Sequence, residues 1–115
     1  MIIWQAKQYD QAWEKIYGPC DKMSQADLDS KLALLLERGN QAKAPLSKSI
    51  GNGLFELRVK NIRVFYYFGN EKIIVFVHGF IKKCSKIPKR EMRTALRNKK
   101  SSETGEKTHG LNLQY

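Results

Sequence analysis

The sequence predicts one small α+β domain, with two N-terminal helices packed on a mostly antiparallel sheet and a basic helix near the C-terminus. Three observations support this fold class. The chain has 115 residues, the usual length of a single domain. A leucine stripe at helical spacing precedes three apolar segments rich in β-branched and aromatic residues. A basic segment follows them, so the helices are separated in sequence from the run of strands.

The N-terminal part is expected to form a short strand and two helices. The apolar run at residues 1–4 predicts an edge strand. Apolar residues at i, i+3 and i+4 predict a helix over residues 11–17, which the following Gly-Pro pair ends. Ser24 is the predicted N-cap of a longer helix, and Gly39 suits its C-terminal end. The core stripe of this helix consists of Leu28, Leu32, Leu35 and Leu36.

The second half of the chain predicts a three-stranded meander and then a helix. Residues 41–52 are expected to form a loop, because a proline and glycines lie in or beside them. Turn residues separate the three strand-like segments that follow. These segments are residues 54–60, 62–68 and 72–77. Pro88 suits the first turn of a helix that runs to about Asn98.

The domain is expected to span residues 1–100. Residues 101–115 contain Ser, Thr and Gly and only a few apolar side chains. Such a composition at a chain end is typical of a flexible tail, which is what we expect here.

Pairing the strands places two arginines opposite each other. A tight turn at Lys60-Asn61 pairs Arg58 with Arg63, and side chains alternate between the two faces from there. A turn at Gly69-Asn70 then sets the third strand. The predicted core face carries Phe55, Leu57, Val59, Ile62, Val64, Tyr66, Ile73, Val75 and Val77. The predicted arginine face carries Glu56, Arg58, Arg63, Phe65, Tyr67, Ile74, Phe76 and His78.

Two explanations for the arginine pair remain open on the residues alone. Like charges directly opposite each other are destabilising, on a scale of about 0.2–1 kcal/mol. Glu56 lies on the same face and can bridge both guanidiniums in an ordinary surface ion network. Alternatively, Arg58 and Arg63 bind phosphate, whose oxygens match guanidinium forks. Phe65 and Tyr67 on the same face then offer flat surfaces on which bases stack.

The charge distribution indicates a polyanionic partner. Lys and Arg number 21 against 11 Asp and Glu, a formal net charge of +10. Residues 82–100 hold nine of these cations and one acid, Glu91. A clustered positive field attracts polyanions. Charge alone does not separate nucleic acid from an anionic membrane surface, an acidic protein or a merely solubilising face.

Cysteines and histidines exclude several other classes. Cys20 and Cys84 stand in no metal-binding or disulfide pattern, which predicts reduced thiols in the cytoplasm. His78 and His109 have no carboxylate cluster beside them, so we expect neither a metal nor another cofactor. The N-terminus lacks the pattern of a signal peptide, and no apolar run reaches membrane-spanning length.

Two stretches resemble a known protein family. They are GLFELRVKNIRVFYYF and KIIVFVHGFIKKCSKIPKREMRTAL, at residues 53–68 and 72–96. They resemble the RelE/ParE toxin superfamily, in particular its HigB-type, phage-derived host-inhibition branch. The matching positions are Gly53, Leu54, Glu56, Leu57, Arg58, Arg63, Tyr66, Phe68, His78, Phe80, Lys82, Lys83, Lys86, Pro88 and Glu91. Two features depart from the family pattern. Cys84-Ser85 stands where Thr-Gln is common, and residues 101–115 extend past the usual end.

The resemblance implies the toxin of a type II toxin–antitoxin pair. Such a toxin enters the ribosomal A site, cuts mRNA and inhibits translation, and a helix-turn-helix antitoxin neutralises it. Two alternatives remain open. One is a ParE-like inhibitor of DNA gyrase on the same fold without nuclease activity. The other is an RNA-binding module without catalysis, which predicts salt-dependent affinity and no cut products.

Metal-independent RNA cleavage of the kind that the resemblance implies begins with attack of a 2′-hydroxyl on the neighbouring phosphate. Arg58 and Arg63 are the predicted groups that stabilise the phosphorane charge. Lys83 is the preferred one of three candidate lysine bases, the others being its neighbours Lys82 and Lys86. His78 is a candidate acid or base, although a lone histidine at a strand end more often has a structural hydrogen bond.

The basic helix and its surroundings are expected to bind RNA outside this catalytic group. The alternatives are a solvated face or a surface that an acidic antitoxin covers, and an antitoxin there would also block RNA. The predicted RNA-binding residues are Lys60, Phe65, Tyr67, Lys82, Lys86, Lys89, Arg90, Arg93 and Arg97.

Overall fold

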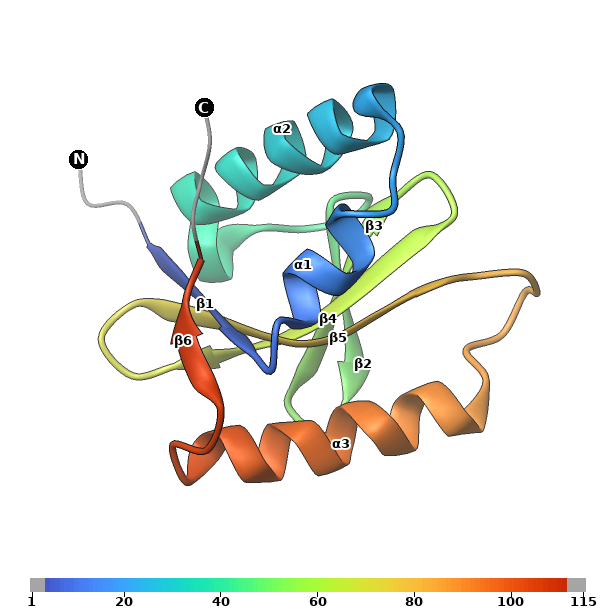
Figure 1. Cartoon of the computed structure of the whole chain (residues 1–115). Helices are drawn as coiled ribbons and strands as arrows, with labels where there is room; N and C mark the ends of the chain where they lie inside the picture. The colour runs from blue at the N-terminus through green and yellow to red at the C-terminus, as the bar shows by residue number, and fades with distance from the viewer. Residues whose placement is uncertain (1–3, 112–115) are drawn as a thin grey trace.

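The chain folds into a six-stranded sheet with helices on both faces (Figure 1). This computed structural model describes residues 4–111. The strands are β1 (Gln5–Tyr9), β2 (Ser47–Gly51), β3 (Leu54–Val59), β4 (Ile62–Gly69), β5 (Ile73–Ile81) and β6 (Thr108–Gly110). The helices are α1 (Ala12–Tyr17), α2 (Lys22–Arg38) and α3 (Lys89–Glu103), with a 3₁₀ turn at Gly39–Gln41. The strand order is β2-β3-β4-β5-β1-β6, and only β1 and β5 pair in parallel. The predicted α+β class with a mostly antiparallel sheet is therefore confirmed.

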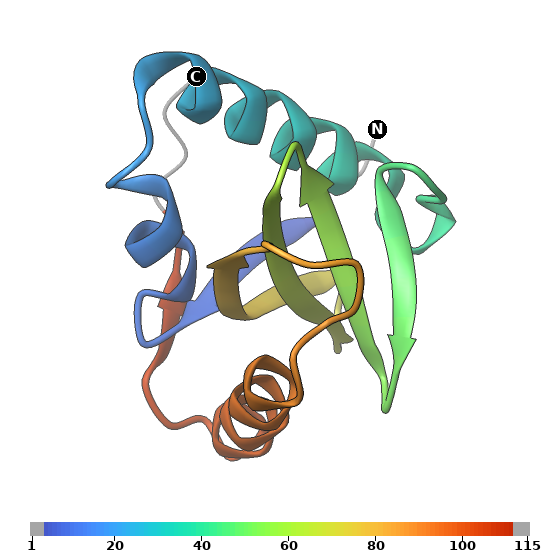
Figure 2. The ribbon, with the colours of Figure 1, turned by 90° about the vertical axis from the view of Figure 1, so that its right-hand side faces the viewer.

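The sheet separates two apolar clusters. Helices α1 and α2 cover one face, and α3 covers the other (Figure 2). The first cluster contains the four predicted leucines of α2, all at most 3% exposed, packed against Trp13 of α1 and the sheet. The second cluster contains Phe65, Tyr67 and Val75 beneath Ala95 of α3. No helix within residues 4–111 is long and apolar enough to cross a bilayer.

Helix α2 begins earlier than the sequence indicated. Asp21 is its N-cap, and the Asp21 carboxylate accepts a hydrogen bond of 2.8 Å from the backbone N–H of Ser24. The predicted cap at Ser24 is therefore wrong, because the preceding acid satisfies one of the free N–H groups of the first turn. Gly39 ends α2 at φ +56°, as predicted. The Trp4 indole also packs against Gly39 where a Cβ atom would lie, so a side chain is excluded there.

The β3–β4 register is confirmed, whereas the predicted β4–β5 register is wrong. Strands β3 and β4 pair Val59 with Ile62 and Arg58 with Arg63, as predicted. The β4–β5 turn has three residues between Gly69 and Ile73 rather than two, which moves the side chains of β5 to the opposite faces. The corrected positions follow from this shift: Ile74 and Phe76 lie under α1 and α2, whereas Ile73, Val75 and Val77 lie with α3.

A β-bulge restores the predicted face of His78. Phe65 pairs with His78 and Tyr66 pairs with Phe76, so Val77 is the extra residue between them. The bulge reverses the alternation once more. His78 therefore lies on the arginine face, as the sequence predicted.

The predicted loop at residues 41–52 contains strand β2. This edge strand pairs with β3 from Ser47–Leu57 to Gly51–Leu54, around a turn at Asn52-Gly53. Both turn residues have positive φ, +57° and +76°. Asn-Gly is the preferred pair for such a two-residue hairpin turn, and this signal in the sequence points to the strand that the prediction missed.

The predicted flexible tail is wrong for residues 101–110. Helix α3 continues to Glu103, and β6 pairs with β1 from Tyr9–Thr108 to Lys7–Gly110. The expected edge strand at 1–4 is also corrected, because β1 covers residues 5–9 and lies between β5 and β6. The partner of β6 is about a hundred residues away in sequence, so local composition does not reveal the pairing. The parts of these predictions at residues 1–3 and 112–115 lie outside the described residues.

Removing β6 should destabilise the domain. A chain that stops after Thr104 loses the β1–β6 ladder, and we expect its unfolding free energy to fall by roughly 1–3 kcal/mol for the few hydrogen bonds lost. Urea denaturation measures this change, with a chain that stops after Leu111 as the matched control. Equal stability of the two truncated chains would show that β6 contributes nothing.

Tyr66 should make stability pH-dependent in the alkaline range. Its hydroxyl is hydrogen-bonded to Ser47 of β2, and burial raises the pKa of Tyr66 from 10.0 to about 12. The folded state therefore favours neutral tyrosine. Stability is fully present below pH 10 and falls by up to about 3 kcal/mol as the pH rises through 12.

Denaturation of the wild type and Tyr66→Phe between pH 9 and 12 tests this expectation. The variant should be less stable at neutral pH, because Ser47 loses its buried partner. Its stability should nevertheless decline less over the alkaline range. Parallel declines in both proteins would show that Tyr66 is not the titrating group.

Candidate functional site

A basic pocket lies at the end of the β3–β4 hairpin. It has a volume of about 600 Å³. Its lining residues are Arg58, Lys60, Asn61, Arg63, Lys82, Lys83, Cys84 and Ser85. The backbone N–H of Lys82 donates a hydrogen bond of 2.7 Å to the Asn61 carbonyl, which brings the end of β5 against the hairpin turn. Five cations from three strand ends thus meet at one opening, and no Asp or Glu of residues 4–111 lines it.

Glu56 lies beneath the two arginines. Its Oε1 atom is 3.3 Å from Arg58 Nε and 3.6 Å from Arg63 Nε, and its side chain is only 3% exposed. The bridging arrangement that the sequence allowed is therefore present, as a buried ion cluster rather than a surface one. One carboxylate offsets one of the two positive charges, so the cluster keeps a net positive charge.

The two arginines are held very differently. A nitrogen at the tip of the Arg63 guanidinium donates hydrogen bonds to the carbonyls of Lys60 and Ile62, at 2.6 and 2.9 Å. The Arg63 side chain is 9% exposed, and its Nε atom has no hydrogen-bond partner because Glu56 is too far for one. The Arg58 side chain is 38% exposed. Arg58 is therefore the guanidinium that a ligand reaches, and Arg63 is fixed behind it.

The three candidate lysines do not share one environment. Lys82 is half-buried and Lys83 is exposed, and both line the basic pocket. Lys86 is exposed and is not among the residues of that lining. A lysine base needs a desolvated amine. The exposed position of Lys83 does not supply this, so its ammonium is better placed as a charge or a proton donor.

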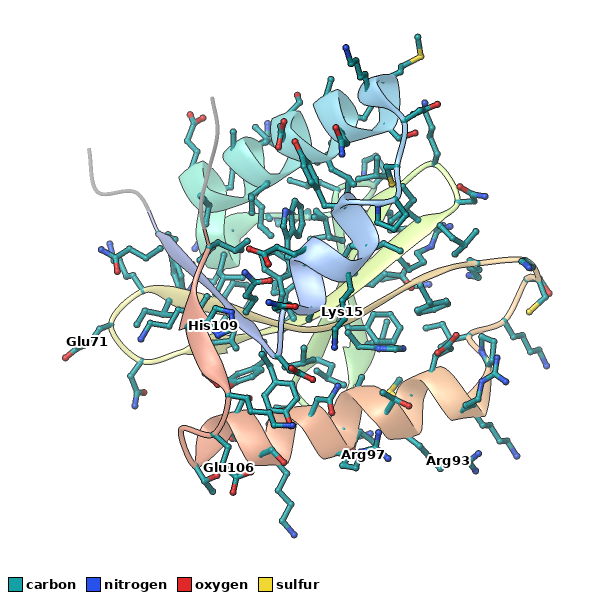
Figure 3. The ribbon with its side chains drawn as sticks, viewed as in Figure 1. Lys15, Glu71, Arg93, Arg97, Glu106 and His109 are labelled. Carbon is teal, nitrogen blue, oxygen red and sulfur yellow. The ribbon has the colours of Figure 1, made fainter. Side chains whose placement is uncertain are left out.

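His78 lies outside the basic pocket. Its Nε2 atom is 2.8 Å from Glu91 Oε1 on α3, and both side chains are mostly buried. It borders another pocket of about 330 Å³, between α1, β5 and α3. Lys15 and Arg97, labelled in Figure 3, also line that pocket. The structural alternative for His78, a hydrogen bond that attaches α3 to the sheet, is therefore the one observed.

Phe65 and Tyr67 are buried, which corrects their predicted role in base stacking. Phe65 is 0% exposed and Tyr67 is 8% exposed beneath α3. The Tyr67 hydroxyl is 2.7 Å from Ser102 Oγ, and the Lys99 ammonium lies 5.2 Å from the Tyr67 ring centroid. The arginine face is thus a second core over most of its length. The end that carries the arginines opens into the basic pocket.

The remaining predicted RNA-binding cations lie on α3. Lys89, Arg90, Arg93 and Arg97 are all exposed, and none takes part in an ion pair within the described part of the chain. Figure 3 shows Arg93 and Arg97 about one turn apart on α3. They do not line the basic pocket. Asn61 also lines the basic pocket and was not among the predicted site residues, although its place in the hairpin turn beside Lys60 was an available signal.

The family model described as "Phage derived protein Gp49-like" matches residues 19–100, which include both arginines and most of α3. No protein with a curated description matches the chain. The family match covers more than half of the sequence.

Three solved structures share the fold. An Escherichia coli RelE toxin with two arginines replaced by alanine, in the free state, has a TM-score of 0.60 at 13% identity and covers 83% of this chain and 96% of its own. The isolated E. coli RelE toxin has a TM-score of 0.56 at 14% identity, with 78% and 96% covered. The RelBE2 toxin–antitoxin complex of Mycobacterium tuberculosis has a TM-score of 0.53 at 14% identity, with 71% and 94% covered. These likenesses confirm the RelE-like fold, and the chain belongs to the phage-derived Gp49-like family.

Proposed function

We propose that the chain is the toxin of a type II toxin–antitoxin pair that cleaves mRNA at the ribosome and so inhibits translation in the cytoplasm. The observation that carries this proposal is the basic pocket, where five cations converge on an opening that no described acid lines. The RelE-like fold supports a toxin. A solved relative is a toxin–antitoxin complex, which supports a neutralising antitoxin partner, of the helix-turn-helix type that the HigB-like motifs imply.

In the proposed reaction, the 2′-oxygen forms a bond to the neighbouring phosphorus and the bond from phosphorus to the 5′-oxygen breaks. Negative charge accumulates on the phosphate oxygens in between. The half-exposed guanidinium of Arg58 contacts these oxygens, and Lys82 and Lys83 add positive charge from the other side of the pocket. Glu56 holds Arg58 in place from below, and Glu56 in turn contacts Arg63.

Proton transfers complete this reaction. The 2′-hydroxyl loses a proton to water, and the departing 5′-oxygen takes one from the exposed Lys83 ammonium. His78 has no part in the mechanism, since it lies against α3 outside the basic pocket. A pocket without a carboxylate or imidazole base among its described lining residues suits a weak nuclease on free RNA. The ribosome then supplies the orientation of the reacting groups.

Replacing Arg58 should abolish cleavage. Primer extension on mRNA from cells that express wild type should reveal cuts within translated codons, and Arg58→Ala should reduce them by about a hundredfold or more, as loss of a charge-stabilising donor does. Lys72→Ala, an exposed cation in the turn at the other end of β4, is the matched control and should cut normally. Circular dichroism verifies that both variants fold.

Three results would contradict the proposal. Persistent cuts in Arg58→Ala would remove Arg58 from the reaction. Growth arrest by wild type without any cuts would favour the gyrase-inhibitor alternative, which a DNA supercoiling assay then examines directly. Binding of RNA without cuts or growth arrest would leave only the RNA-binding module.

Replacing Glu56 should separate stability from RNA affinity. Glu56→Gln keeps the shape but leaves two guanidiniums without a counter-charge, so we expect a loss of about 3 kcal/mol in unfolding free energy, near the lower limit for a broken buried pair. The same change makes the pocket more positive, so affinity for a short RNA should rise. Urea denaturation and fluorescence anisotropy measure the two effects.

Glu103→Gln is the control for Glu56→Gln. Glu103 is half-exposed and, among residues 4–111, pairs only with Lys99 at 3.3 Å, so this equal change in net charge should alter stability by less than about 1 kcal/mol. Equal effects of the two variants would show that Glu56 has no special role beneath the arginines.

A further inference from the structure

A second basic pocket lies on the other side of Arg58. It has a volume of about 460 Å³ and shares Arg58, Lys60 and Arg63 with the first pocket. Its other lining residues are Lys31, Leu34, Arg38, Lys43, Ala44, Pro45 and Leu46. They come from α2 and from the segment that leads to β2. Figure 2 shows the β3–β4 turn reaching toward α2, and Lys60 Nζ is 3.1 Å from Asp27 Oδ2 of that helix.

Three cations are particular to this pocket. Lys31, Arg38 and Lys43 are exposed, and within residues 4–111 none of them takes part in an ion pair. The lining contains no Asp or Glu among the described residues. Six cations thus surround a small volume, against two carboxylates, Asp27 at Lys60 and Glu56 at the two arginines. Such a cluster repels itself and concentrates anions, which favours an anionic ligand over an empty, solvated face.

The floor of the second pocket is apolar. Leu34 is half-buried and Leu46 is buried, whereas Ala44 and Pro45 are exposed beside them. A ligand that suits the pocket therefore combines negative charges at intervals with flat apolar groups. Single-stranded nucleic acid has this combination, since phosphates alternate with bases along the chain. An inorganic anion or a purely acidic peptide leaves the apolar floor unused.

We propose that the second pocket binds the nucleotides on one side of the scissile phosphate, so that one RNA strand crosses Arg58 and Lys60 from the first pocket into the second. This inference rests on the proposed function, because it places the scissile phosphate at Arg58. Lys31 and Lys43 contact phosphates of the flanking nucleotides, and a base lies on Leu34 and Pro45. The two pockets form one RNA track around the end of the hairpin.

The test measures how affinity depends on RNA length. Fluorescence anisotropy is recorded with a trinucleotide and a heptanucleotide of 2′-O-methyl RNA, which lacks the attacking hydroxyl, across a range of salt concentrations. The variant is Lys31→Gln with Lys43→Gln, and Arg38 stays because it lies in the last turn of α2, where a cation stabilises the helix. The control is Lys72→Gln with Lys107→Gln, two exposed cations that line neither pocket.

Wild type and the control should bind the heptanucleotide more tightly than the trinucleotide. The Lys31/Lys43 variant should bind the trinucleotide normally and lose the gain with length. Each lost phosphate contact should lower heptanucleotide affinity roughly fivefold at 0.1 M salt and reduce the slope of log affinity against log salt by about 0.7. These results would support the RNA track.

An equal gain with length in wild type and the Lys31/Lys43 variant would overturn the inference. The inference would also be overturned if the Lys31/Lys43 variant kept the RNA affinity of wild type but bound an oligoglutamate peptide more weakly. The second pocket would then belong to an acidic protein partner. Either outcome leaves cleavage at Arg58 intact. The proposed function fails separately, if cuts persist in Arg58→Ala.

Discussion

The contact of one buried carboxylate with two arginines is the interaction on which the candidate site depends. Arg58 and Arg63 face each other across a strand pair, where like charges repel. Glu56 approaches both within 4 Å and is almost fully buried, so it offsets that repulsion together with the desolvation of Arg63. Because it supplies only one negative charge, the group remains positive and open to an anion.

The path of α3 confines this group to one end of the sheet. Helix α3 covers the middle of the arginine face and buries Phe65 and Tyr67 there. Its contacts with the sheet include the pairs His78–Glu91 and Tyr67–Ser102. Histidine and tyrosine are common in nucleic-acid sites, but on the arginine face of this protein they attach α3 to the sheet. The segment between β5 and α3 then brings Lys82 and Lys83 to the uncovered end.

The RelE-like fold persists here at 13–14% identity to solved toxins. At such low sequence identity, a shared fold reflects the strand alternation and helical periodicity of apolar residues that bury the two cores. It does not show that catalytic residues are shared. The chemistry of this chain therefore depends on its own side chains. Those side chains are rich in cations, and the described lining of the basic pocket has no carboxylate or imidazole, which suits the proposed reliance on the ribosome for orienting the substrate.

Local patterns in the sequence determined much of this protein. The leucine stripe predicted the core of α2, and the tight turn at Lys60-Asn61 predicted the register that pairs Arg58 with Arg63. These features depend on residues close together in the chain, where helical and strand periodicities are strong signals. The Asn52-Gly53 turn was an equally local signal for β2, although the surrounding polar residues obscured it.

Only the tertiary structure decided which of the predicted site residues meet. The three-residue turn after Gly69 and the bulge at Val77 reversed the faces of β5 twice, and neither has a clear mark in the sequence. The burial of Phe65 under α3, the separation of His78 from the arginines and the pairing of β6 with β1 all join segments that are distant along the chain. Such contacts depend on how whole elements pack, because alternation along one strand assigns a residue to a face but does not say what covers that face.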